Sequence, residues 1–148
     1  ESLTMLNARF QGTDERDRPY TITADMATQD SRNPELVKLE LPKADMTLED
    51  GTWLALTARR GEYHRSSQLL DLVGAVSLFH DNGFELRTER ARIDLANGSA
   101  TGGQKVIGQG TEGSITGEGF QVLDRGARII FTGESRLVLR PQAEAAIR

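Results

Sequence analysis

Hydrophobic and polar residues alternate along most of the chain in short runs with a period of two. The clearest runs cover residues 20–24, 54–58, 70–78, 84–88, 93–95 and 137–139. A period of two places successive side chains on opposite faces of a strand, so each run predicts a half-buried β-strand. No window of eleven or more residues keeps a helical period, and the only helical candidate is the short tail after Pro141. The pattern therefore predicts an all-β fold.

Turn signals lie between these runs. Asp50-Gly51, Asn82-Gly83 and Asn97-Gly98 each place a glycine where a tight hairpin needs a positive φ angle. Asn97-Gly98-Ser99 also has the form of a glycosylation sequon, but Asn-Gly is a favoured hairpin turn, which is the interpretation adopted here. The spacing of the turns predicts antiparallel strands.

The strand-forming segments repeat. Thr23, Thr57, Thr88 and Thr116 are each followed, three or four residues later, by a small residue, and these small residues are Ala27, Gly61, Ala91 and Gly119. A repeat of about 30 residues made of short strands cannot bury its apolar face alone, so neighbouring units must stack into one elongated core. Ten of the 15 glycines lie between residues 98 and 133, which predicts more bends and bulges in the last two units.

Size and composition fit a single domain. The chain has 148 residues and a mass of 16.3 kDa, for which we expect one domain over residues 1–140 and a flexible tail over residues 141–148. The net charge of -4 excludes the basic footprint of nonspecific nucleic-acid binding. The absence of cysteine excludes disulfides, zinc knuckles and thiol catalysis.

The sequence contains no membrane-spanning segment. Its longest uninterrupted apolar run, Trp53–Leu56, is far shorter than the roughly 20 residues that a spanning helix requires. We therefore expect a soluble domain. Because the chain begins with Glu1 rather than Met, we also expect that an upstream targeting or anchoring segment is missing from it.

Two patterns suggest ligand chemistry, and each has a simpler interpretation. Gly108, Gly110 and Gly113 match a dinucleotide-binding fingerprint, but the residues that follow have no helical face, so a glycine-rich turn is predicted. His64 and His80 are the only histidines, and neither has the spacing of a metal-binding motif. The sequence predicts neither a cofactor nor a metal site.

Carboxylates are the remaining candidates for catalysis. Asp71, Glu85, Glu89 and Asp94 lie on the polar phase of alternating strands. A pair of them about 5 to 9 Å apart would suit glycoside hydrolysis, but a solvated strand face explains them more simply. No serine lies in a nucleophile-elbow context. The chain is therefore predicted not to be an enzyme, and an enzyme that acts on polysaccharide remains the alternative.

The apolar strand phase has two interpretations. Composition alone favours a closed core. Small residues such as Gly74, Ala75 and Gly133 would also leave room for an apolar groove, and aliphatic walls bind acyl chains without directional demands. A sealed-core interaction module and a lipid-binding groove are both open at this point.

Seven short motifs follow one another in an order shared with a known family. They are Phe10–Asp14, Arg18–Ala24, Ala44–Gly51, Gly61–Tyr63, Leu70–Leu78, Gly83–Thr88 and Gly119–Leu123. In this order they resemble the periplasmic domain of the LptC family, the membrane-anchored part of the lipopolysaccharide export bridge of Gram-negative bacteria. The resemblance extends from about Leu6 to Leu139, and it matches residues 29–42 only loosely.

The resemblance implies a fold and a set of partners. The implied fold is an open, twisted antiparallel β-jellyroll, boat-shaped in section, whose interior holds the acyl chains of lipopolysaccharide. The implied location is the periplasm, with a transmembrane anchor before Glu1. The implied partners are the LptBFG transporter at the N-terminal edge and LptA at the C-terminal edge, each joined by strand addition. A homodimer is left open.

These expectations assign residues to two roles. By strand phase, the lipid-facing wall is predicted to contain Leu56, Leu72, Val76, Leu78, Leu86, Ile93 and Phe131. The two partner-binding edges are predicted near Phe10, Tyr20 and Ile22 and near Gly119, Ile129, Gly133, Leu137 and Leu139.

Overall fold

Antiparallel β-strands account for almost all of the described chain. The computed structural model describes residues 2–47 and 51–141, and within these residues it contains 14 strands, one 3-10 turn and no α-helix. The elements are β1 (Ser2–Thr13), β2 (Pro19–Asp30), β3 (Asn33–Glu40), β4 (Lys43–Thr47), β5 (Trp53–Thr57), β6 (Arg60–His64), β7 (Leu69–His80), β8 (Glu85–Asp94), β9 (Ser99–Gly102), β10 (Val106–Gln109), β11 (Gly113–Gly117), β12 (Gly119–Leu123), η1 (Asp124–Gly126), β13 (Arg128–Thr132) and β14 (Arg136–Leu139).

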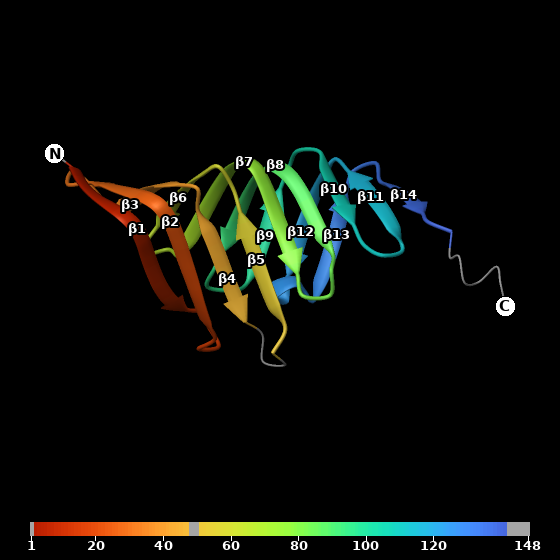
Figure 1. The fold of residues 1–148 in the computed structure, drawn as a ribbon, viewed down its shortest axis with the longest axis horizontal. Helices are drawn as coiled ribbons and strands as arrows, with labels where there is room; N and C mark the ends of the chain where they lie inside the picture. The colour runs from red at the N-terminus through yellow and green to blue at the C-terminus, as the bar shows by residue number, and fades with distance from the viewer. Residues whose placement is uncertain (1, 48–50, 142–148) are drawn as a thin grey trace.

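The strands form one sheet that is folded into two layers (Figure 1). β4, β5, β10, β11 and β14 lie in the front layer, and β3, β6, β9, β12 and β13 lie in the back layer. The long strands β1, β2, β7 and β8 run through both layers. For example, β7 pairs with β5 near one end and with β6 near the other. The body is elongated, with the N-terminus at one end and the C-terminus at the other (Figure 1). The predicted all-β jellyroll is confirmed.

The layers meet along one edge, the corner, where every pass of the chain bends from one layer to the other. The bends lie at residues 7, 25, 41, 58–59, 74–75, 89, 103–105, 118 and 133–135. Several need left-handed backbone, with φ near 50° at Asn7, Leu41 and Ala75 and 89° at Gly74. The bends recur about every 16 residues, half the repeat seen in the sequence, because each repeat crosses the corner twice.

The small residues of the sequence repeat lie next to this corner on the back layer. Ala27 and Gly61 pair with Leu39, and Gly61 and Ala91 pair with Leu72, all with their side-chain positions inward. Small and large residues therefore alternate along the sheet, which lets the leucines interdigitate. The fourth unit is out of phase, because Phe120 rather than Gly119 takes the inward position.

The edge opposite the corner carries the hairpin turns of both layers, and we call it the mouth. Its turns are residues 14–18, 81–84 and 110–112 on the front layer and residues 31–32, 65–68, 95–98 and 124–127 on the back layer. The predicted hairpins at Asn82-Gly83 and Asn97-Gly98 are confirmed, with φ of 93° at Gly83 and 71° at Gly98. β4 and β5 also pair as a hairpin, although Asp50 lies outside the described residues.

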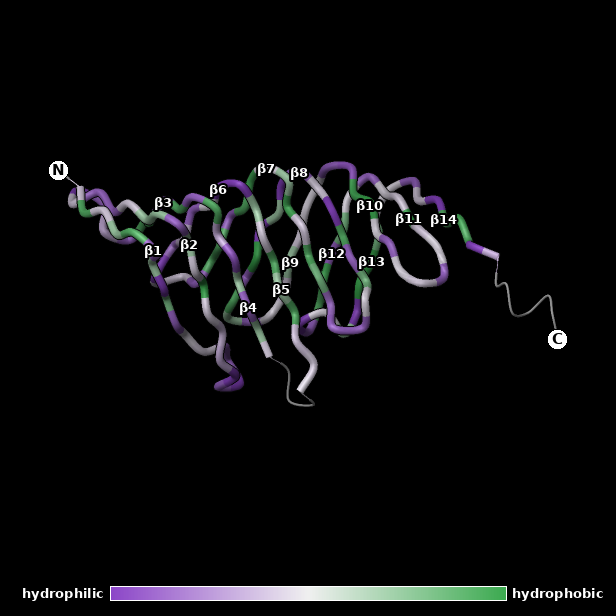
Figure 2. The backbone as a smooth tube through the Cα atoms, in the orientation of Figure 1, coloured by the Kyte–Doolittle hydropathy of each residue, from purple (hydrophilic) through white to green (hydrophobic). Residues whose placement is uncertain are grey.

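Apolar side chains fill the space between the layers. Figure 2 shows hydrophobic and hydrophilic residues alternating along the strands, and the inward phase forms one continuous core cluster. One predicted run departs from this pattern. Leu137 and Leu139 on β14 are 60% and 67% exposed, because β14 extends past the back layer and has no strand behind it. The predicted flexible tail, apart from Pro141, lies outside the described residues.

Candidate functional site

The inward face of the sheet carries all seven predicted wall residues. Leu56, Leu72, Val76, Leu78, Leu86 and Ile93 are at most 3% exposed, and Phe131 is half-buried against them. The strand register is therefore as the alternation predicted, since a slip of one residue would have turned these side chains outward. These residues come from both layers, so they face one another across the interior.

The interior is packed rather than open at mid-body. The space left among Met46, Leu54, Leu56, Leu78 and Ile93 is only about 10 Å³, too little for an acyl chain. The family resemblance implies an open trough, and this part of the interior is instead closed. The reason lies at the mouth, where polar groups join the two layers.

Two of these cross-mouth contacts come from the N-terminal turns. The side-chain amide of Gln68, on the back layer, donates to the carbonyl oxygen of Thr13 at 3.0 Å and also contacts the Tyr20 hydroxyl. The backbone N–H of Glu15 donates to the carbonyl oxygen of Ala96 at 2.8 Å. Each contact ties a front-layer turn to a back-layer turn.

The third contact is a buried arginine. Arg125 in η1 is 0% exposed, and its Nη1 and Nη2 donate to the carbonyl oxygens of Thr47 at 2.9 Å and Arg18 at 3.0 Å. Its Nε lies 3.0 Å from Oδ2 of Asp14, which is also buried. Arg125 therefore reaches from the back layer into the front layer, and we call these four residues (Asp14, Arg18, Thr47 and Arg125) the Arg125 clasp.

The two fully buried charged groups of the clasp, Asp14 and Arg125, keep their charge near neutral pH. Burial alone would raise the pKa of Asp14, but backbone N–H groups of Arg18 and Arg16, the Arg18 side chain and the Arg125 charge together hold that pKa below 3.8. Burial lowers the pKa of Arg125, and the Asp14 charge opposes this change. An arginine starts from so high a pKa that it stays protonated.

The mouth is different at the C-terminal end. Phe84, Ile115, Ile129 and Phe131 point inward there but stay only half-buried. They gather over Gly108, where an added methyl group would lie 2.8 Å from both phenyl rings. Among the described residues, no hydrogen bond joins the front-layer strands β10, β11 and β14 to the back layer across the mouth. This end of the interior is open to solvent.

Unpaired strand edges lie at both ends of the body. Among the described residues, β1 pairs only with β2, β13 only with β12, and β14 only with β11. Leu137, Val138 and Leu139 on β14 are all more than half exposed. Exposed edges of this kind are templates for strand addition.

The predicted N-terminal edge residues need a correction. Tyr20 and Ile22 are 2% and 0% exposed on β2, which is paired on both sides by β1 and β4, so they lie in the core and not at the edge. Phe10 does lie on the edge strand β1, but its ring points inward and stacks edge-on against Tyr63 with centroids 5.6 Å apart. The alternation of apolar residues cannot show which strand of a hairpin is outermost.

The predicted C-terminal positions fall into two groups. Ile129, Leu137 and Leu139 lie on the edge strands β13 and β14. Gly119 lies on β12, an inner strand, and a methyl group there would meet the Thr132 side chain and the carbonyl oxygen of Gly102. Gly133 lies at the bend between β13 and β14 with φ of 74°, packed against Glu118.

Three of the four candidate carboxylates are engaged in ion pairs and turns, and the fourth, Glu89, is exposed at the corner. Arg92 donates to both oxygens of Asp71 at 2.7 and 2.9 Å, which lowers the pKa of Asp71, and His64 contacts the same carboxylate. Glu85 pairs with Arg87, and the side chain of Asp94 accepts backbone N–H groups of its own turn. Glu62, His64 and Asp71 lie close enough to share a metal ion, but Arg92 already holds Asp71. This arrangement gives no support to catalysis.

The glycine fingerprint forms a hairpin, as predicted. Gly108 lies on β10 and Gly113 on β11, and the two strands pair directly without a helix.

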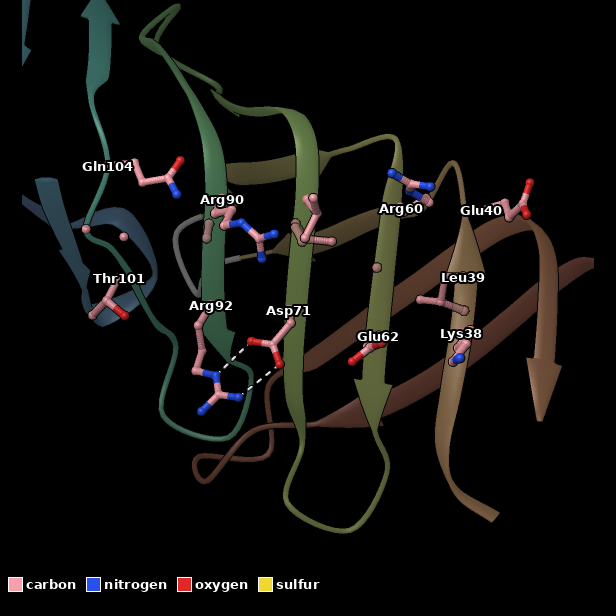
Figure 3. A pocket seen from close by; sticks show the side chains of 16 residues that line it. Lys38, Leu39, Glu40, Arg60, Glu62, Asp71, Arg90, Arg92, Thr101 and Gln104 are labelled. Carbon is pink, nitrogen blue, oxygen red and sulfur yellow. Dashed lines mark hydrogen bonds and ion pairs between the residues drawn. The ribbon is translucent and has the colours of Figure 1, made fainter. Parts of the chain in front are cut away.

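A wide hollow lies on the outside of the molecule. Its volume is about 890 Å³, and it lies on the outer face of the back layer, over β3, β6, β7, β8 and β9 (Figure 3). Arg60, Arg90 and Lys38 line it together with Glu40 and Glu62, so its charges are mixed. Because the charges of the outward strand phase alternate in sign, the sequence pattern carries no signal of this hollow.

The sequence reasoning also missed Asp14 and Arg125 as a pair. Both lie in turns, where alternation carries no information, and they are 111 positions apart in the chain. In the sequence, Asp14 belongs to the motif Phe10–Asp14, whereas Arg125 belongs to none of the seven motifs.

Comparison with known proteins identifies the family. The family model described as lipopolysaccharide-assembly, LptC-related, matches residues 1–137. The chain belongs to this LptC-related family. The family is one of transport bridge proteins and not an enzyme family. This LptC-related chain is also 28% identical over 130 residues to "Uncharacterized protein RP506" of Rickettsia prowazekii (strain Madrid E). The match covers 88% of the present chain and 63% of the relative.

None of the described residues forms a helix long and apolar enough to cross a membrane.

Proposed function

We propose that this domain carries the acyl chains of lipopolysaccharide between its two layers as one component of a bridge across the periplasm. The membership of the LptC-related family carries the proposal. A continuous aliphatic interior supports it, since each CH₂ of an acyl chain costs about 0.8 kcal/mol to hold in water. Aliphatic side chains, which carry no hydrogen-bonding groups, form a surface that suits acyl chains.

The strand edges suggest how the domain joins its neighbours. We propose that β1 pairs with a jellyroll of the LptBFG transporter and that the β13–β14 end pairs with LptA. The support is that these edges are unpaired and lie at opposite ends of the body, so strand addition at both would extend the interior in two directions. An N-terminal helix before Glu1 would anchor the domain to the inner membrane.

Photocrosslinking with purified lipopolysaccharide tests the carrier role. A photoreactive residue at Phe131 or Val76, both inward, is expected to capture the lipid. The same residue at Ser77, the outward neighbour of Val76 on β7, is the matched control and is expected to capture none. Capture from Ser77 alone would contradict the proposal.

A sealed-core interaction module is the second candidate, because the space at mid-body is only about 10 Å³. It predicts pairing with a β-rich partner through β1 or β14 and no lipid capture at Phe131 or Val76. The same crosslinking experiment therefore separates the two functions.

A further inference from the structure

The turn that carries Arg125 of the clasp has a strained backbone. Three successive residues of its turn, Asp124, Arg125 and Gly126, have φ of 52°, 52° and 94°. Two of them carry a side chain in this left-handed region, where only glycine is free of strain. A fully buried arginine is thus held on a strained turn.

The ion pair between Arg125 and Asp14 also lacks an aligned hydrogen bond. Nε of Arg125 lies 3.0 Å from the Asp14 carboxylate, yet it is buried and is not aligned for a hydrogen bond with any group. Breaking the contact would return Arg125 to water, where every donor finds a partner. The closed state therefore leaves one donor of the buried arginine without an aligned hydrogen-bond partner.

The position of the clasp decides what would open. Arg125 packs over Gly98, where a methyl group would lie 2.7 Å from Arg125 Cγ. The next residue, Gly126, lies against the side chain of the core residue Leu54. Releasing Arg125 would separate Thr47 and Arg18 on the front layer from η1 on the back layer. The apolar interior lies directly behind these groups.

We propose that the Arg125 clasp is a gate on the apolar interior, and that it opens to admit acyl chains from the mouth. The proposal rests on the proposed carrier function. It explains why the same interior is packed at mid-body and half-exposed beyond the clasp. Acyl chains received at the β1 end would advance past the clasp toward the open C-terminal end as the clasp releases.

An unlocking variant tests the gate. Arg125→Gly removes the clasp side chain and relieves the left-handed backbone. It leaves Asp14 satisfied, because the N–H groups of Arg16 and Arg18 and the Arg18 side chain still bind it. Asp124→Gly is the control, since it relieves the same φ of 52° and keeps the four clasp residues. It also removes the ion pairs of Asp124 with Arg16 and Arg18, but these are 4.0 and 3.9 Å long and the Asp124 side chain is exposed, so they contribute little.

The readout is uptake of N-phenyl-1-naphthylamine, an uncharged apolar fluorophore, by the folded domain. Arg125→Gly is expected to take up the fluorophore at least about threefold faster than wild type, while Asp124→Gly matches wild type. Far-ultraviolet circular dichroism checks that both variants are folded. Equal uptake by Arg125→Gly and wild type would overturn the gate.

A locking variant tests the same claim from the other side. The Glu15 N–H to Ala96 carbonyl bond brings the two backbones close together across the mouth, and the chain has no cysteine, so Glu15→Cys with Ala96→Cys introduces a single disulfide. Thr21→Cys with Asp45→Cys is the control, because it joins neighbouring strands of the front layer only. Oxidation is expected to slow uptake about tenfold in the first pair alone, with recovery on reduction. Unchanged uptake in the oxidised first pair would overturn the gate.

Purified lipopolysaccharide, used beside the fluorophore, separates the gate from the proposed cargo. If fluorophore uptake is faster in the unlocking variant and slower in the oxidised locking variant, but lipopolysaccharide binds none of the proteins, the gate stands and the cargo assignment fails. If lipopolysaccharide binds every variant and wild type equally, the cargo stands and the gate is overturned.

Discussion

The N-terminal two-thirds of the molecule and its C-terminal third use the same strand pattern but close differently. In the first region, polar groups cross the mouth at Gln68, Glu15 and Arg125, and the side chains behind them are almost completely buried. Beyond Arg125, which reaches back into the first region, no hydrogen bond of the described residues joins β10, β11 or β14 to the back layer across the mouth, and the inward side chains remain half-exposed. Closure of this interior therefore depends on a few turn residues and not on its apolar content.

The glycines are distributed unevenly between these two regions of the molecule. Ten of the 15 glycines lie between residues 98 and 133. At Gly108 the absent side chain leaves room for the rings of Phe84 and Phe131, and at Gly102 for the ring of Phe120. Aromatic rings over glycines replace the interdigitated leucines of the first region. Left-handed backbone occurs here at Gly98, Gly126 and Gly133, but the register shifts of the described strands lie at Gln29–Asp30 and Val73–Val76, in the earlier units. The predicted excess of bulges in this part of the chain is therefore wrong.

Removing the Asp14 charge should have the largest effect on stability. Asp14→Asn leaves Arg125 buried without a counter-charge, and the loss of one partner of a buried pair costs about 3–5 kcal/mol. Urea unfolding at pH 7 measures it. Arg128→Gln removes an exposed charge beyond the clasp and is the control. Loss of less than about 1 kcal/mol would show that the clasp does not hold the layers together.

The pH dependence of the same residue sharpens this test. Folding lowers the pKa of Asp14. The ionised carboxylate therefore makes its full contribution to the free energy of unfolding above the unfolded-state pKa near 3.8, and this contribution is lost as the pH falls through the folded-state pKa. Wild type should therefore lose more stability than Asp14→Asn between pH 5 and about pH 2. Parallel stability curves for the two proteins would contradict the assignment.

Matched isoleucine truncations compare the two regions directly. Ile93→Ala, at a site 2% exposed in the closed region, is expected to cost about 2–5 kcal/mol, because it leaves a cavity. Ile129→Ala, at the half-buried open end, should cost about half as much, since its side chain is already partly hydrated. Chemical denaturation of both variants measures the difference, and equal losses would show that the open end is as well packed as the closed one.

A methyl group at Gly119 should disturb only the C-terminal region. It would lie 2.6 Å from Thr132 Oγ1 and 2.8 Å from the carbonyl oxygen of Gly102, which cannot retreat without moving β9. Overpacking of this kind costs about 1–3 kcal/mol. Hydrogen exchange should show faster exchange on β12 and β13 and unchanged protection on β7. Gly103→Ala, where nothing lies within 4 Å, is the control.

Charges on the exposed edge should have the smallest effect on stability. Leu137→Arg with Leu139→Arg changes side chains that are 60% and 67% exposed, so the free energy of unfolding should stay within about 0.5 kcal/mol of wild type. Pairing with an LptA-type jellyroll should fall, since charged residues block strand addition. Pull-down with purified LptA measures it. Unchanged pairing would show that LptA binds at an edge other than β14.

Much of the fold follows from local sequence pattern. Alternation predicted the inward phase, including Leu72 and Leu78, because burial of one strand face is imposed residue by residue. The Asn-Gly turns predicted their hairpins, since few residues accept a positive φ. The order of short motifs identified the family, which the family model confirms.

The arrangement of the edges and of the mouth depended on contacts that local pattern does not encode. Tyr20 and Ile22 were expected at an edge and lie in the core, because whether β1 covers β2 is decided by pairing between strands. Asp14 and Arg125 meet across 111 positions of sequence, and their partners are backbone carbonyl oxygens that any residue carries. Amino-acid type thus specifies which side chains avoid water, whereas the meeting of distant turns specifies whether the interior they form is open or shut.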